Sequence, residues 1–137
     1  MASVPRDLVL VSTPIGYLGS GRGGGVELTL ASLTQGLQAR GHRLTLVAPE
    51  GSSHPAGCDG MALHTVAGGD QPSWQHADAD GPVLIPPDAV LPRLWERALA
   101  LGEEADAVLN FSYDWLPLWL TPRVQPRIFH LISMGSV

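Results

Sequence analysis

The first fifty residues combine an apolar run, a glycine-rich turn, an amphipathic segment and a second apolar run. The first run, Leu8–Ser12, is a short β-branched stretch typical of a buried parallel strand. After the glycines, apolar side chains recur at helical spacing, at Val26, Leu30, Leu33 and Leu37. Gly41 provides a left-handed stop for this helix, and residues 43–48 predict a second strand. A strand, a helix and a strand within about forty residues predict a right-handed βαβ unit.

The alternation of strands and helices continues along the chain. A strand is expected at 62–66, a helix at 91–105, and two more strands at 107–111 and 127–132. We therefore predict an α/β fold, a Rossmann-like doubly wound parallel sheet. In such sheets ligands bind beyond the carboxyl ends of the strands.

The segment 51–90 differs from the rest because it is rich in Gly, Pro, Asp and Ser. Beyond the strand at 62–66, only 83–85 has strand character. A loop of this length in a small domain is either functional or disordered. Its polar and aromatic residues could form a lid over a substrate or be solvated, and both interpretations stay open: Trp74, His76, Asp78 and Asp80.

The charged residues exclude several classes of protein. The chain has 137 residues, enough for one domain, and carries 8 basic against 13 acidic side chains. All the basic residues are arginine, so no lysine can form a Schiff base or bind a P-loop phosphate. Their scattered positions argue against a nucleic-acid partner, which needs a clustered basic face.

Cysteine count and hydropathy limit the chain further. Cys58 is the only cysteine, so neither an intrachain disulfide nor a thiolate zinc cluster can form. His54, Cys58 and Asp59 are metal-ligand types without a second cluster, and we expect no metal site. We find no signal peptide and no apolar run approaching the ~20 residues of a membrane span. A cytoplasmic protein without a membrane span is the expectation.

The glycine-rich turn has the spacing Gly19-x-Gly21-x-x-Gly24, which matches the dinucleotide-binding pattern. Its glycines let backbone N–H groups approach a phosphate at the start of the following helix. Glu50, after the second strand, is placed to hold a ribose. However, about six residues separate the first strand from Gly19, whereas the dinucleotide turn begins almost at the strand end. A nicotinamide- or flavin-binding domain therefore stays an alternative, and so does a flexible surface loop.

Polar residues also follow the strand at 107–111. Asp114 could orient a hydroxyl or accept a proton, and Trp115 could stack on a ring. Alternatively, a following helix has Trp115, Leu116, Leu118 and Trp119 in its core. His130 lies within an apolar strand. It could be either a hydrogen-bonded core residue or a catalyst.

Several segments carry a resemblance to a known family. They are Val11–Pro14, the turn Gly23–Glu27, the helix end Ala39–His42, and the stretches 106–110 and 113–115. Together they resemble the amino-terminal half of retaining GT-B glycosyltransferases of family 4. Tyr113 stands where that family often has a histidine near the reacting sugar, which puts the role of that histidine in doubt here.

The resemblance implies that residues 1–137 form the amino-terminal, acceptor-binding half of a GT-B architecture. A separate carboxyl-terminal domain, absent here, would hold the nucleotide. No closing helix follows the last strand, so we expect the natural polypeptide to be longer and the chain alone to be inactive. The implied reaction moves a sugar, with glucose expected, from a UDP-sugar to a small acceptor without a cofactor or metal. Within the family the chain is similar to cyanobacterial UDP-glucose:tetrahydrobiopterin glucosyltransferases, which implies a pterin acceptor.

The resemblance also implies roles for individual residues. Backbone N–H groups would bind the donor diphosphate at Gly23, Gly24 and Gly25. The residues expected at the reacting centre are Tyr113, Asp114 and His130. The residues expected to contact the acceptor are Pro14, Gly16, Tyr113 and Trp115. A third interpretation, besides the transferase half and the dinucleotide-binding domain, is a non-catalytic α/β interaction module.

Overall fold

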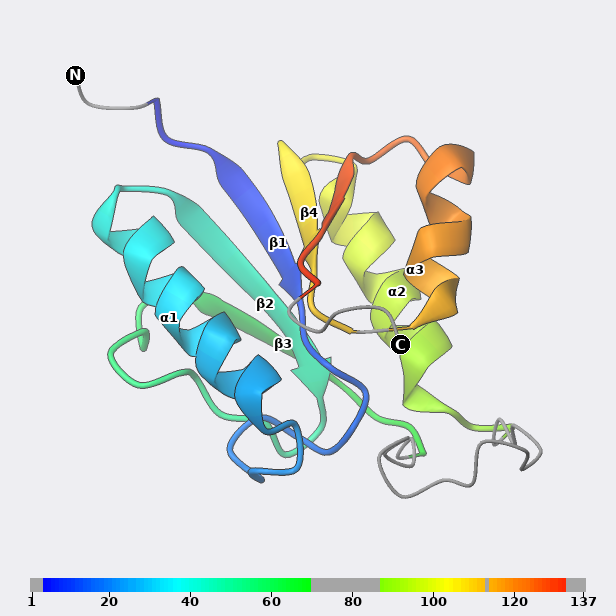
Figure 1. The fold of residues 1–137 in the computed structure, drawn as a ribbon. Helices are drawn as coiled ribbons and strands as arrows, with labels where there is room; N and C mark the ends of the chain where they lie inside the picture. The colour runs from blue at the N-terminus through cyan, green and yellow to red at the C-terminus, as the bar shows by residue number, and fades with distance from the viewer. Residues whose placement is uncertain (1–3, 70–86, 113, 133–137) are drawn as a thin grey trace.

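A computed structural model describes residues 4–69, 87–112 and 114–132. Its centre is a five-stranded, all-parallel sheet with the strand order β3-β2-β1-β4-β5 (Figure 1). The strands are β1 (Asp7–Val11), β2 (Arg43–Pro49), β3 (Ala62–Val66), β4 (Ala107–Asn110) and β5 (Ile128–His130). The predicted Rossmann-like doubly wound α/β sheet is confirmed.

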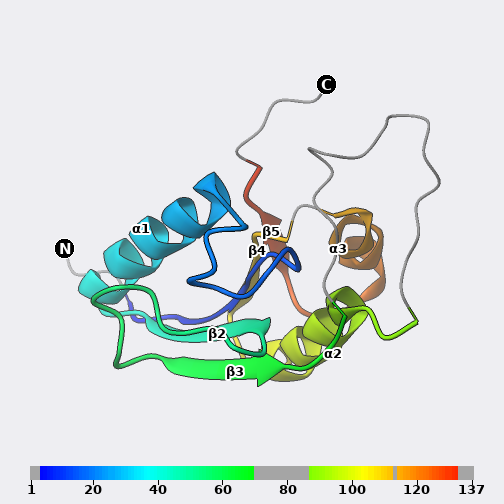
Figure 2. The same cartoon turned by 90° about the horizontal axis from the view of Figure 1, so that it is seen from below.

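The helices lie on both faces of this sheet. They are α1 (Gly25–Ala39), α2 (Val90–Gly102) and α3 (Trp115–Leu120), with a 3₁₀ turn, η2 (Thr121–Arg123), after α3. The chain moves outward from β1 to β2 and β3, then returns through α2 to β4 on the other side of β1. Right-handed crossovers in opposite directions place their helices on opposite faces. Figure 2 accordingly shows α1 on one side of the sheet and α2 on the other.

Strand alternation divides the core into two layers. In β1, Val9 and Val11 face α2 and α3, whereas Leu8 and Leu10 face α1. The α2 layer is built around residues with almost no exposed surface: Val90, Leu94, Trp95 and Ala98. The α1 layer contains Leu30 together with Cys58 and Met61, from the connection between β2 and β3. That connection has no helix, so these two side chains extend the cover over the sheet beyond α1.

Element boundaries differ from the predictions by one residue at β1, β2 and β4, and by more at α2 and β5. Helix α2 ends at Gly102, not at 105. A Cβ at Gly102 would lie 2.8 Å from Val108 Cγ2, so the helix end packs closely against β4 and the chain turns there. Strand β5 ends at His130, two residues earlier than predicted. The possible strand at 83–85, and the possible lid residues Trp74, His76, Asp78 and Asp80, lie outside the described residues.

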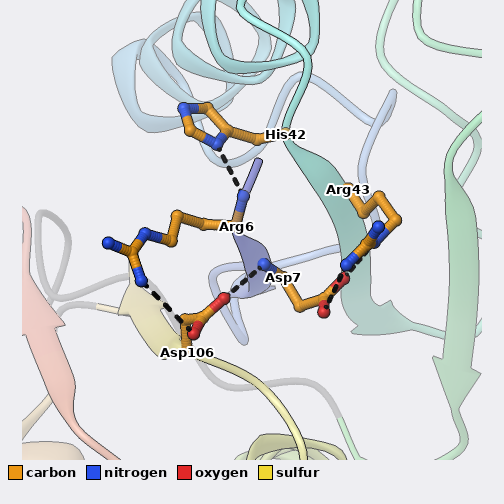
Figure 3. Close-up of polar contacts among 5 residues, drawn as sticks. All are labelled: Arg6, Asp7, His42, Arg43 and Asp106. Atoms are coloured by element: carbon orange, nitrogen blue, oxygen red, sulfur yellow. Dashed lines mark hydrogen bonds and ion pairs between the residues drawn. The ribbon is translucent and has the colours of Figure 1, made fainter. Parts of the chain in front are cut away.

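The amino ends of three strands are joined by polar contacts (Figure 3). The Arg43 guanidinium donates two hydrogen bonds to the Asp7 carboxylate, at 2.5 and 2.8 Å. The Asp7 N–H donates to Asp106 Oδ2, and Arg6 lies 3.8 Å from the other oxygen of Asp106. The Arg6 N–H donates to His42 Nδ1. These contacts align β1 with β2 and β4 at the edge opposite to the glycine-rich loop.

No helix in the described part of the chain is long and apolar enough to cross a membrane.

Candidate functional site

Two segments meet the carboxyl edge of the sheet, where ligands bind in this type of fold. The glycine-rich loop leaves β1 and leads into α1, and α3 begins shortly after β4. Both lie at the end of the molecule to which the strands point (Figure 1). The strand order reverses between β1 and β4, so this edge includes the topological switch point.

The glycine-rich loop requires glycine at specific positions. Gly16 has φ +72°, and a Cβ there would lie 2.7 Å from Ser20 Oγ. Gly24 precedes α1 with φ 55° and ψ −129°, a conformation open essentially to glycine alone. The loop is therefore a folded turn with a defined backbone.

Glu27 holds this turn in place. One carboxylate oxygen accepts a hydrogen bond from the Gly19 N–H at 2.7 Å, and the other accepts from the Gly23 N–H at 3.0 Å. Glu27 is the third residue of α1, the position from which a glutamate reaches back in a capping box. A Cβ at Gly23 would lie 2.8 Å from Glu27 Cγ, so the missing side chain at Gly23 makes room for the carboxylate.

The three glycines expected to bind a diphosphate differ in their present contacts. Gly23 donates to Glu27, and Gly24 donates to the Gly21 carbonyl at 3.2 Å. Gly25 is the first residue of α1, so its N–H has no acceptor within the helix. An incoming diphosphate could bind Gly25 directly, but it would have to displace the Glu27 carboxylate to reach Gly23.

A cavity of about 440 Å³ lies on the α3 side, at the carboxyl ends of β4 and β5. It is lined by Asn110, Asp114, Trp115, Leu118, His130, Leu131 and Ile132. Trp115 is 57% exposed and Ile132 is 68% exposed, so two large apolar side chains face solvent at this cavity. The Asp114 carboxylate caps α3 by accepting a long hydrogen bond from the Leu116 N–H at 3.5 Å. An apolar concavity with a few fixed polar groups is the usual form of a small-molecule site.

Two polar residues of this cavity, Asn110 and His130, belong to a continuous network. Asn110 Oδ1 accepts from the Ser112 N–H at 2.7 Å and from the Ser112 hydroxyl at 2.5 Å. The Trp95 indole N–H donates to the same hydroxyl oxygen at 3.2 Å. Because both bonds from Ser112 need an acceptor, the Asn110 side chain must direct its NH₂ group toward His130, 2.9 Å away.

The protonation of His130 follows from its two partners. The Thr121 hydroxyl donates its only hydrogen to the Pro117 carbonyl at 2.7 Å, so it can only accept from His130 Nε2, 2.8 Å away. Nδ1 faces the Asn110 NH₂ group and must be the acceptor. The network therefore assigns a neutral imidazole protonated on Nε2. Desolvation by burial lowers the pKa of His130 from the ordinary 6.5, which favours the same neutral form.

The structure brings together only part of the predicted site. Asp114, Trp115 and His130 line one cavity. Pro14 and Gly16 are buried within the glycine-rich loop, and Tyr113 lies outside the described residues. The core interpretation of Trp115 and Trp119 is wrong, because they are 57% and 50% exposed. The same interpretation is wrong for Leu118, which is 53% exposed, and is confirmed for Leu116, which packs against the α2 layer together with Leu120.

Sequence reasoning missed Glu27, Asn110 and Thr121. The capping-box spacing of Glu27 after Gly24 could have identified the first. Nothing local marks the other two, because their contacts join residues up to twenty positions apart. Ser12 directly follows β1 and its side chain is fully buried. Among the described residues, its hydroxyl has no hydrogen-bond partner.

The residues of metal-ligand type at 54–59 have other contacts. His54 Nε2 lies 2.8 Å from the Met61 carbonyl, and the Cys58 thiol is directed at the Ala56 carbonyl. Desolvation by burial raises the pKa of Cys58, so its thiol is neutral and poorly nucleophilic. Across the described ranges, no group of three histidine, cysteine or acidic side chains is placed to hold a metal ion.

Comparison with known proteins adds no family assignment. No protein-family model matches the sequence, and no curated protein matches it significantly.

Proposed function

We propose that this chain is the acceptor-binding half of a retaining glycosyltransferase, one that moves a sugar from a UDP-sugar to a small ring-containing acceptor. The observation that carries the proposal is the cavity between α3 and β5, with Trp115 on its wall and Asp114 at its edge. The resemblance of Val11–Pro14, Gly23–Glu27 and Ala39–His42 to retaining GT-B enzymes of family 4 supplies the reaction class.

The cavity suits an acceptor with a flat ring and polar edges. An exposed indole such as that of Trp115 offers a large apolar face on which a ring can stack. Asp114 is the only formally charged residue lining the cavity in the described ranges. A carboxylate accepts hydrogen bonds and does not donate them, so it favours acceptors that carry N–H or O–H groups. A reduced pterin has both properties and is the acceptor we propose.

The donor would lie at the glycine-rich loop. The start of α1 directs the N–H of Gly25 and the positive end of the helix dipole outward, and these favour a diphosphate leaving group. Preorganised dipoles of this kind stabilise charge that develops in the transition state. The Glu27 carboxylate opposes the same anion through its charge. Productive binding of a UDP-sugar therefore requires either that Glu27 is displaced or that the second domain offsets its negative charge.

Ligand-observed NMR of the chain with a reduced pterin, UDP-glucose and NAD in one competition series tests this function. We expect saturable binding of the pterin, a weak response to UDP-glucose and none to NAD. A chain that binds none of the three, or binds NAD alone, would contradict the proposal.

A matched pair of tryptophan variants locates the pterin. Trp115 lines the cavity, whereas Trp119 is similarly exposed but carries the Arg123 guanidinium over its ring, 4.3 Å from the centroid. We expect Trp115→Ala to weaken pterin binding about tenfold or more, which corresponds to ~1.4 kcal/mol for loss of a stacking face. Trp119→Ala should bind like the wild type. Equal losses in both variants would place the ligand elsewhere.

A nicotinamide- or flavin-binding domain is the second candidate. Glu50 is exposed immediately after β2, at the carboxyl edge, where an acidic side chain holds the ribose in dinucleotide-binding folds. If NAD binds, Glu50→Gln should weaken it while Asp114→Asn leaves it unchanged. If Asp114→Asn weakens NAD binding and Glu50→Gln does not, NAD binds in the cavity at α3.

A further inference from the structure

The network around His130 joins residues of five elements, which are β4, β5, η2, α3 and α2. His130 in β5 contacts Asn110 in β4 and Thr121 at the start of η2, and Thr121 continues to Pro117 in α3. On the other side, Asn110 connects through Ser112 to Trp95 in α2. The imidazole is thus the link between α3 and the strands. It also lines the cavity whose wall α3 forms.

Only a neutral imidazole satisfies every member of this network. A second proton on Nδ1 would direct a donor at the donor NH₂ group of Asn110. Rotating the Asn110 amide would give His130 an acceptor but would take the acceptor away from the Ser112 N–H and hydroxyl. Either arrangement leaves a buried or half-buried polar group without its partner, which destabilises the charged form.

We propose that His130 is a positioning residue whose neutral form fixes α3 against the sheet, and that its protonation releases α3 and disrupts the cavity. The residue does not need to touch the ligand to control binding. The proposal concerns the shape of the cavity and is independent of which small molecule the cavity holds.

Few charged side chains surround His130, so few of them can influence its protonation. Strand β4 and helix α3 contain no charged side chain. The charged residues nearby are Asp114, which lines the same cavity, Arg123 in η2, and Arg127, which precedes β5. Arg123 donates to the Trp119 carbonyl and stacks on the Trp119 ring.

Proton–nitrogen NMR of the unmodified chain tests this positioning role. At about pH 8 we expect His130 as the Nε2–H tautomer. As the pH is lowered to about 5, the indole N–H resonances of Trp95 and Trp115 should shift with the same midpoint as the His130 ring. A predominant Nδ1–H tautomer would overturn the proposal. So would protonation of His130 that leaves both indole resonances unchanged.

Two variants separate this histidine from the others. His130→Gln retains a donor toward Thr121 but cannot titrate, so the shifts of the Trp95 and Trp115 resonances with that midpoint should disappear. His64→Gln, in the edge strand β3, is the matched control and should leave them intact. If the shifts persist in His130→Gln or vanish in His64→Gln, another group drives them.

A second matched pair tests the link to α3 at constant pH. Thr121→Val removes the hydroxyl that accepts from the His130 Nε2–H, whereas Thr121→Ser keeps a hydroxyl at the same position. We expect the Trp115 indole resonance of Thr121→Val at neutral pH to resemble that of the acidified wild type. Thr121→Ser should resemble the wild type at neutral pH. Identical spectra for the two variants would refute the link.

Discussion

The Glu27 carboxylate gives the sharpest test of how the glycine-rich loop is held. It accepts two backbone hydrogen bonds, from Gly19 at 2.7 Å and from Gly23 at 3.0 Å, and it lies in the first turn of α1. We predict that Glu27→Ala destabilises the fold although alanine has the higher helix propensity. A loss of stability would show that the loop contacts of Glu27 outweigh helix propensity, and a gain would show the opposite.

The size of the effect follows from these contacts. A hydrogen bond to a charged group contributes about 1.5–3 kcal/mol. Since the contact to Gly19 is exposed, we take about 1 kcal/mol for each bond, the range of an ordinary hydrogen bond. The helix dipole adds a few tenths of a kcal/mol and alanine propensity subtracts a similar amount. Glu27→Ala should then lose about 2 kcal/mol, and Glu27→Gln, which keeps one acceptor, about half of that.

Urea unfolding followed by circular dichroism measures the loss for Glu27→Ala. Leu28→Ala is the matched control, because Leu28 is 74% exposed on the same helix and should change stability by less than about 0.5 kcal/mol. Hydrogen exchange should also become faster at the amides of Gly19 and Gly23, because they lose their acceptor. If Glu27→Ala is as stable as Leu28→Ala and exchange is unchanged, the carboxylate does not hold the loop and this reasoning is wrong.

Three further changes have clear expected outcomes. Gly16→Ala should lose more than about 1 kcal/mol in thermal or urea unfolding, because Gly16 has φ +72°, whereas Gly36→Ala, in open space within α1, should gain about 0.5–1 kcal/mol. Ser12→Ala should be neutral or gain up to about 1 kcal/mol in urea unfolding, because the buried hydroxyl has no partner to lose; a clear loss would reveal a partner. The hydrogen bond from Arg43 lowers the pKa of Asp7 below 3.8, so this pair stabilises the fold above that pH and less as the pH falls through the folded-state value. Melting temperatures of Arg43→Ala and wild type should therefore converge in acid, and a constant gap would contradict this.

The sheet and its two large helices could be predicted from the sequence because their signals are local. Continuous apolar runs such as Leu8–Ser12 mark buried parallel strands, and the spacing of Leu91, Leu94 and Trp95 marks a helix face. The predicted strand at 62–66 agrees with β3 in both bounds. The strand order β3-β2-β1-β4-β5 results when the chain adds β2 and β3 on one side of β1 and then β4 and β5 on the other, with right-handed crossovers.

The candidate site could be predicted only in part, because its contacts are not local. Trp115 and Trp119 look like core residues of an apolar helix, but α3 is one short helix at the sheet edge and buries only one side. His130 looked like either a core residue or a catalyst. Its actual state depends on Asn110 and Thr121, and no sequence periodicity relates the three positions.

Two of the polar groups considered for chemistry at the carboxyl edge have internal partners. The amide of Gly23 donates to Glu27, and both nitrogens of His130 are occupied by Asn110 and Thr121. A His130 that acted as a general base would have to abandon the Asn110 contact, and the buried Asn110 side chain would lose its partner. Affinity for a small molecule must therefore come mainly from the apolar wall beside Trp115. The contacts of both His130 nitrogens with Asn110 and Thr121 support the proposed positioning role of His130.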